Sequence, residues 1–129
     1  MRNMKLVWTG RVISWLITLP FVFSAVSKLF YEKMFPEMPE QMAKMGLPME
    51  ILKPVAILEI MCIVMYSVPV TSVLGAVLFT GYLGGAILTH IRIGDPVFTH
   101  VIFGLLIWLG IYLRDPRLHD VLPFRKKVE

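Results

Sequence analysis

The chain has 129 residues, of which 57% are hydrophobic, and its mean hydropathy is +0.71. Soluble domains contain roughly 45–50% apolar residues, so this composition excludes an ordinary water-soluble globule and is typical of an integral membrane protein. The net charge is +4, but no basic stripe with interleaved aromatic residues occurs, which excludes nucleic acid as a partner. In a membrane protein, an excess of positive charge is typical of segments that set the orientation of the chain in the membrane and contact lipid head groups.

Four apolar runs are each close to the roughly 20 residues that cross a bilayer as a helix. They predict an all-α membrane protein, a four-transmembrane-helix bundle that forms a single domain over residues 1–129. We expect the spans at about 7–29, 51–68, 70–91 and 97–113. No small-x-small cleavage site follows the first run, so we interpret it as a retained helix and not as a cleaved signal peptide.

The longest connection, residues 30–50, predicts a short amphipathic helix on the outer side of the membrane. Pro39 is typical of the first turn of a helix, and Gly46 is typical of its C-terminal stop. Methionines recur on one helical face at Met38, Met42, Met45 and Met49. Thioethers could bind Cu(I), but the loop has no histidine or cysteine, so we favour packing against the bilayer or the bundle.

Basic residues are distributed unevenly between the two ends of the predicted bundle. The side with both termini carries eight, namely Arg2, Lys5, Arg11, Arg114, Arg117, Arg125, Lys126 and Lys127. The opposite side carries five, namely Lys28, Lys33, Lys44, Lys53 and Arg92. The positive-inside rule then predicts that both termini, including the basic tail 114–129, are cytoplasmic. We expect the protein in a bacterial inner (plasma) membrane.

Glu59 lies in the middle of the second apolar run, where a carboxylate costs roughly 2.5–3.5 kcal/mol on insertion scales. The other ionisable groups of the spans fall in the same outer half of the bundle, at Lys28, His90, Arg92 and His100. We therefore expect an outward-facing polar cleft with Glu59 as its floor and Lys28, His90 or Arg92 as its charge partner. The ligand-binding candidates around it are Arg92, His100, Tyr82 and Ser27.

Each of these residues also has a purely structural interpretation. Glu59 could be protonated, or held in an ion pair that fixes helix register, and long basic side chains can snorkel to the interface. We expect no metal, because the spans contain no HxxxH or ExxxH pair. Cys62 is the only cysteine, which excludes an intrachain disulfide and a CxxC redox pair.

Gly81 and Gly85 form a GxxxG motif in the third span. Small residues at this spacing let two helices approach closely in lipid. The motif predicts either close helix packing within the chain or a homodimer.

Several of these segments together resemble the DoxX-like membrane proteins. The stretch Phe23–Leu29 is similar to their first-span motif of an aromatic, small residues and a lysine, and Glu59 is similar to the glutamate of their second span. Gly46-Leu47-Pro48 resembles the Gly-Leu-Pro before that span, and the stretch from Gly81 to Asp95 resembles their third span and its exit. The resemblance runs from about Leu16 to Arg117, although the glycine usual in the first-span motif is absent here.

The resemblance implies a four-helix bundle with Lys28, Glu59 and His90 as the functional positions, which we expect to be catalytic. It also implies a role in quinone-linked sulfur oxidation or in a membrane oxidoreductase complex. More distant relatives imply a role in the assembly of other membrane proteins. We predict an accessory subunit of a quinone-linked oxidoreductase system, in which Glu59 and His90 exchange protons with a head group and Lys28 orients an oxygen. The alternative is a non-enzymatic assembly, chaperone or lipid-binding module, and whether the chain is itself an enzyme stays open.

No electron-carrying cofactor motif occurs in the sequence. The bound molecule that we expect is therefore a quinone or a lipid, and an electron donor would be a membrane or extracytoplasmic redox protein.

Overall fold

The computed structural model describes residues 3–127, and every regular element in that part of the chain is helical. Four long helices, α1 (Met4–Leu29), α4 (Leu52–Ser67), α5 (Ser72–Ile91) and α6 (Phe98–Arg114), form the bundle. Each contacts two neighbours in the cyclic order α1, α4, α5, α6. The all-α prediction is confirmed, and the long helices lie within a few residues of the four apolar runs. Arg2 and the last two residues of the predicted domain lie outside the described residues.

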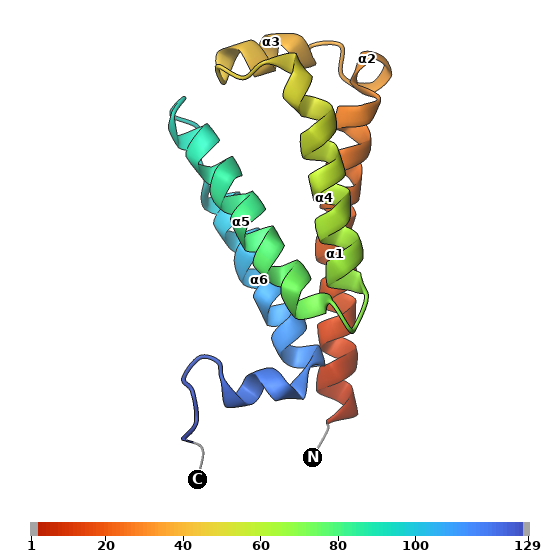
Figure 1. Cartoon of the computed structure of the whole chain (residues 1–129), viewed down its shortest axis with the longest axis vertical. Helices are drawn as coiled ribbons and strands as arrows, with labels where there is room; N and C mark the ends of the chain where they lie inside the picture. Colours follow the sequence, from red (N-terminus) through yellow and green to blue (C-terminus); the bar gives the residue numbers. More distant parts are fainter. Residues whose placement is uncertain (1–2, 128–129) are drawn as a thin grey trace.

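Both ends of the described chain lie at one end of the bundle, which we call the terminal end (Figure 1). The turn around Pro69 and the short helix η2 (Pro116–Asp120) lie there as well. The opposite end, which we call the α3 end, carries α2 (Tyr31–Met34), α3 (Met38–Lys44) and η1 (Met49–Ile51). The pair α1 and α4 diverges from the pair α5 and α6 toward the α3 end (Figure 1).

Glycines explain why the helices converge at the terminal end. A Cβ atom added to Gly75 would lie 2.5 Å from Tyr66 Cα, and one added to Gly10 would lie 2.6 Å from the backbone nitrogen of Arg114. Real Cβ atoms do not approach so closely, so only glycine allows these backbones to touch. The Tyr66 hydroxyl donates to the Ile107 carbonyl at 2.6 Å and ties α4 to α6. The main core cluster comprises Ile17, Phe21, Cys62, Tyr66, Ala76, Phe79, Leu83, Ile107, Ile111 and Leu118.

The GxxxG glycines behave differently from the glycines of the terminal end. A Cβ added to Gly81 or Gly85 would meet no heavy atom of the described chain within 4 Å. Close packing within the chain was therefore the wrong interpretation of this motif, because Gly81 and Gly85 line the cleft that opens where α5 diverges from α4 (Figure 1). A homodimer through Gly81 and Gly85 stays a prediction.

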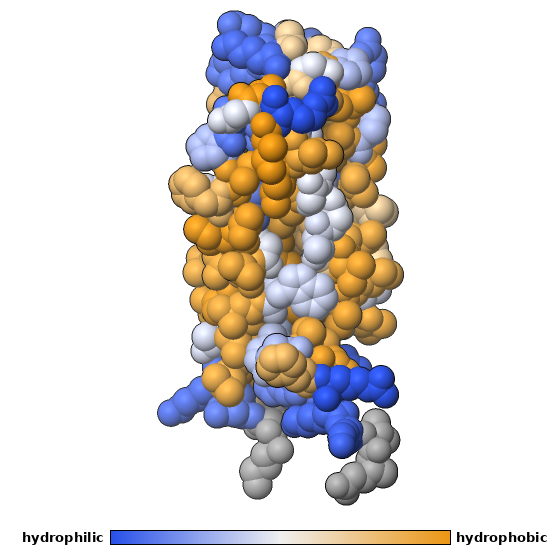
Figure 2. All heavy atoms as spheres, turned by 90° about the vertical axis from the view of Figure 1, so that its left-hand side faces the viewer, coloured by the Kyte–Doolittle hydropathy of each residue, from blue (hydrophilic) through white to orange (hydrophobic). Residues whose placement is uncertain are grey.

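Two of the long helices, α1 and α5, are long and apolar enough to cross a membrane. The helix α6 is a shorter apolar helix of 17 residues, and α4 has 16 residues with Glu59 in its middle. The face that carries α5 and α6 shows a broad hydrophobic band between two hydrophilic ends (Figure 2). The four-span bundle therefore stays a prediction.

Asp115 connects α6 to η2 at the terminal end. Its carboxylate accepts the Arg117 backbone N–H at 3.1 Å and pairs with the Arg117 guanidinium at 2.8 and 2.9 Å. These hydrogen bonds from Arg117 lower the pKa of the Asp115 carboxyl. A carboxyl with a lowered folded-state pKa stabilises the fold above its unfolded pKa of about 3.9, and this stability is lost as the pH falls through the folded-state pKa.

We therefore expect Asp115→Ala to lower the free energy of unfolding by about 1 kcal/mol at neutral pH, as for other lost helix caps. The difference from the wild type should shrink when the pH falls below about 4. Thermal unfolding in detergent at pH 7 and pH 3 measures this, with Asp120→Ala as a control, because Asp120 is an exposed carboxylate in a surface pair with Lys126. A difference of the same size at both pH values would contradict the assigned role.

Candidate functional site

An ion pair between α1 and α4 lies inside the bundle. The Lys28 ammonium is 2.8 Å from Oε2 of Glu59, and the two side chains are 18% and 1% exposed. The ammonium also donates to the Ser24 hydroxyl at 2.5 Å and to the Tyr82 hydroxyl at 3.3 Å. The Ser24 hydroxyl in turn donates to Glu59 Oε2 at 3.3 Å. Three helices thus contribute to one hydrogen-bonded polar cluster, which we call the Lys28–Glu59 cluster.

Helical spacing explains why these side chains meet. The buried residues of α4 recur every three or four positions, at Leu52, Ala56, Glu59, Cys62 and Tyr66. Glu59 therefore occupies the inward face of α4, where a carboxylate needs a charged and hydrogen-bonded partner. On α1, Ser24 and Lys28 are four residues apart and share the face that meets Glu59.

The Lys28–Glu59 cluster lies in the wall of a cleft of about 560 Å³. Most of the lining is apolar and comes from α1, α3, α4, α5 and α6, including Phe21, Leu52, Val55, Leu58, Leu83, Ala86 and Phe103. Small-molecule sites typically have volumes of about 300–1,000 Å³, apolar walls and a few placed polar groups. Among the residues described, the hydrogen bonds to the Glu59 carboxylate go to Oε2, so Oε1 remains available as an acceptor for a ligand.

The helix predicted in the long connection is present as α3, and it covers the cleft. Gly46 follows it with a φ of 70°, a left-handed conformation that favours glycine. Met38, Met42 and Met45 line the cleft, and Met42 is buried. The thioethers are therefore turned toward the bundle, which favours packing as the role of the methionine row. Flexible methionines adapt to apolar surfaces of varied shape.

Two histidines lie on another part of the cleft lining, at the α3 ends of α5 and α6. The rings of His90 and His100 stand 4.7 Å apart with planes inclined by 36°. His90 Nδ1 lies 3.2 Å from Oδ2 of Asp95. His100 Nδ1 is buried without a hydrogen-bond partner within residues 3–127. One ring nitrogen of this histidine pair therefore still lacks a hydrogen-bond partner in the described chain.

The structure brings together Lys28, Glu59, Tyr82, His90 and His100 as lining residues of one cleft. Two other sequence-based candidates lie elsewhere. The buried hydroxyl of Ser27 donates to the Phe23 carbonyl at 2.6 Å, and the exposed Arg92 side chain lies beside Gly46, outside the lining. Lys28 is the charge partner of Glu59, whereas His90 pairs with Asp95.

Sequence reasoning missed Ser24 as a site residue. The available signal was its spacing, because Ser24 is one helical turn from Lys28, whereas the neighbouring Ser27 points about 100° away. Within the described part of the chain, no three side chains of histidine, cysteine, aspartate or glutamate lie close enough to hold a metal ion.

Taken together, the helical bundle, its apolar band and the charged cluster beside an internal cleft are features of a small membrane protein. A model of the DoxX-like family matches residues 12–112. The chain therefore belongs to the DoxX-like family, and the matched segment contains every residue of the Lys28–Glu59 cluster and both cleft histidines. Comparisons with curated proteins and with solved structures gave no match. Family membership and the two long apolar helices together suggest a membrane protein.

Proposed function

We propose that all four long helices cross a membrane. Each exposes large apolar side chains away from the bundle, for example Leu16 on α1, Ile57 on α4, Leu88 on α5 and Leu105 on α6, which are 55–67% exposed. Apolar surface on every side of a bundle is a liability in water and is ordinary in lipid. At about 1.5 Å per residue, α6 is about 25 Å long, and α4 reaches a similar length with the preceding η1. Modest thinning of the bilayer accommodates such helices.

Cysteine labelling tests the proposed orientation. In a Cys62→Ala background, a membrane-impermeant maleimide should label Glu37→Cys at the α3 end in intact cells. Arg125→Cys at the terminal end should react only after the cells are opened. The two positions are exposed, and native Cys62 is buried. Labelling of Arg125→Cys but not Glu37→Cys in intact cells would reverse the orientation, and labelling of both would contradict four spans.

The proposed function of the cleft is to bind an apolar molecule that carries a polar head group, such as a quinone. The observation that supports this most strongly is the buried Lys28–Glu59 pair in the wall of a largely apolar cleft. The ammonium can donate to a carbonyl oxygen, and Glu59 Oε1 can accept from a hydroxyl, so the two groups could hold either redox form of a quinone head. The apolar walls would take the ring and tail.

Such a site fits an accessory subunit of a quinone-linked membrane oxidoreductase system. Glu59 would exchange a proton with the head group, and His90 would pass protons near the outer surface. The electron donor would be a separate membrane or extracytoplasmic redox protein. The competing proposal is a non-enzymatic module that holds a lipid or assists the assembly of other membrane proteins. The inward direction of the methionine row favours a small bound molecule over a protein partner docked on those methionines.

Glycines in the cleft lining allow a direct binding test. Gly81 lines the cleft, whereas Gly84 on the same helix does not, and a Cβ meets no described atom within 4 Å at either position. We expect Gly81→Leu to weaken saturable binding of a radiolabelled short-chain ubiquinone by about tenfold or more, because the new side chain occupies the ligand space. Gly84→Leu is the matched control and should bind as the wild type does.

The same pair of variants separates binding from dimer formation. Size-exclusion chromatography with light scattering reports whether Gly81→Leu changes the oligomeric state. Equal affinity of the wild type and of both variants would contradict quinone binding in the cleft.

A further inference from the structure

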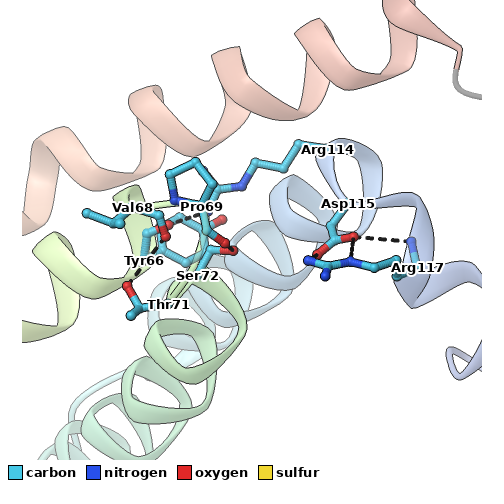
Figure 3. Close-up of polar contacts among 8 residues, drawn as sticks. All are labelled: Tyr66, Val68, Pro69, Thr71, Ser72, Arg114, Asp115 and Arg117. Atoms are coloured by element: carbon cyan, nitrogen blue, oxygen red, sulfur yellow. Dashed lines mark hydrogen bonds and ion pairs between the residues drawn. The ribbon is translucent and has the colours of Figure 1, made fainter.

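A second cavity, of about 580 Å³, lies at the terminal end of the bundle, far along the helices from the Lys28–Glu59 cluster. Three arginines from three elements line it, Arg11 from α1, Arg114 from α6 and Arg117 from η2. Trp15, Pro69 and Ser72 lie in the same lining. Figure 3 shows Arg114 extending toward the turn that carries Pro69, while Arg117 faces Asp115. We call this space the arginine cavity.

Only one of these arginines is neutralised by a carboxylate. Asp115 forms a two-point pair with Arg117, at 2.8 and 2.9 Å. Within residues 3–127, neither Arg11 nor Arg114 lies in a salt bridge. Among the described residues, the arginine cavity therefore carries a net excess of two positive charges, from three arginines and one aspartate.

The two remaining arginines are held by hydrogen-bond and aromatic contacts, without a carboxylate in direct contact among the described residues. Arg114 donates to the Tyr66 carbonyl and lies over the Tyr66 ring, with its guanidinium carbon 4.5 Å from the ring centroid. Its Nε atom is buried and has no partner in the described chain. The Arg11 guanidinium carbon lies 5.2 Å from the centroid of the Trp8 ring. Aromatic faces position a guanidinium without removing its positive charge.

The start of α5 adds to the positive potential of the arginine cavity. Ser72, the first residue of α5, is one of the lining residues, and no acidic residue lies in the first turn. The preceding Thr71 does not cap the helix, because its hydroxyl donates to the Met65 carbonyl at 2.8 Å. The N–H groups of an uncapped first turn and the helix dipole both favour an anion.

We propose that the arginine cavity binds a phosphate group, presented by an anionic phospholipid of the adjoining membrane leaflet. Guanidinium groups bind phosphate through paired N–H donors, and the uncapped helix start complements them. The exposed Trp15 in the lining suits the interface between head groups and acyl chains. This proposal rests on the proposed membrane insertion and is independent of any ligand in the cleft.

Lipid titration followed by native mass spectrometry tests the proposal. The protein, in neutral detergent, is titrated with phosphatidylglycerol or with phosphatidylcholine. Arg11→Gln removes one guanidinium that has no hydrogen-bond partner in the described chain, so the fold should survive, and its melting temperature without added lipid checks this. Arg125→Gln, in the exposed tail outside the arginine cavity, is the matched control.

We expect the wild type and Arg125→Gln to bind phosphatidylglycerol more tightly than phosphatidylcholine. Arg11→Gln should bind phosphatidylglycerol about fivefold more weakly, as expected for one basic residue at an anionic head group. Arg11→Lys should recover part of the loss, because it keeps the charge but not the paired donors.

Inorganic phosphate distinguishes the two sources of a phosphate group. If millimolar phosphate displaces phosphatidylglycerol and itself binds in an Arg11-dependent manner, the site takes soluble phosphates, and the lipid assignment is overturned. If neither phosphatidylglycerol nor phosphate binding depends on Arg11, the phosphate site itself is overturned. If Arg11→Gln does not change lipid binding, the proposed function of the cleft is unaffected. Each of the two proposals can therefore be wrong without the other.

Discussion

Replacing Lys28 by methionine is expected to lower the free energy of unfolding by about 3–5 kcal/mol, the usual effect of removing one partner of a buried ion pair. Glu59 is 1% exposed, so its nearly buried carboxylate would lose the only cationic partner that it has among the described residues. The methionine side chain has a similar length, which limits any effect of lost packing. Thermal unfolding in detergent should show a loss on the order of ten degrees.

A double-mutant cycle separates the ion pair from the packing around it. Glu59→Gln in the Lys28→Met background removes the orphaned charge, so the double variant should recover much of the lost stability. Lys33→Met alters an exposed lysine of α2. It is the control because it also removes one positive charge and adds an apolar side chain, but breaks no buried ion pair. If the double variant is as unstable as the sum of the two single variants, the proposed coupling between Lys28 and Glu59 is wrong.

Gly75→Ala is the substitution expected to damage the terminal end most. Its new Cβ would lie 2.5 Å from Tyr66 Cα, and a backbone atom of a neighbouring helix cannot rotate out of the way as a side chain can. Overpacking of this kind usually destabilises by about 1–3 kcal/mol, and rigid backbone on both sides favours the upper part of that range. The measurement is again thermal unfolding in detergent.

Gly81→Ala on the same helix provides the matched control for this effect. Its Cβ would meet no described atom within 4 Å, and alanine is favoured over glycine inside a helix by about 1 kcal/mol. The two substitutions should therefore change the melting temperature in opposite directions. Equal loss of stability in both variants would mean that the helices diverge less toward the α3 end than the structure indicates.

The positions of the four long helices could be predicted from the sequence because the positions and lengths of the apolar runs determine them. Lys28 was one of three predicted charge partners of Glu59, with His90 and Arg92, because the sequence does not show which cation lies at the same depth on a facing helix. Ser24 was not predicted, although its spacing of one helical turn from Lys28 places it on the same face, whereas the predicted Ser27 donates to the backbone on another face. The Gly81 and Gly85 motif shows a similar limit, because the sequence does not reveal at what level α5 diverges from α4.

The cleft and the arginine cavity depend on how the helices pack. No local pattern predicts that the α3 methionines line the same space as Glu59, because that depends on the path of the chain through residues 30–50. Arg11 and Arg114 could be counted as orientation signals, but their convergence depends on Gly10, at which the backbones of α1 and α6 come together. Contacts between residues about a hundred positions apart arise from packing, and sequence periodicity carries little information about them.

Mass spectrometry of the organic extract of protein purified in mild detergent tests the cleft function most directly. Wild-type protein, Glu59→Gln and the control Gly84→Leu are compared at equal protein concentration. We predict a quinone or similar apolar molecule in near-stoichiometric amount in the wild type and in Gly84→Leu, and its loss in Glu59→Gln. The same bulk phospholipids in all three extracts, with no molecule that depends on Glu59, would contradict a ligand site at the Lys28–Glu59 cluster.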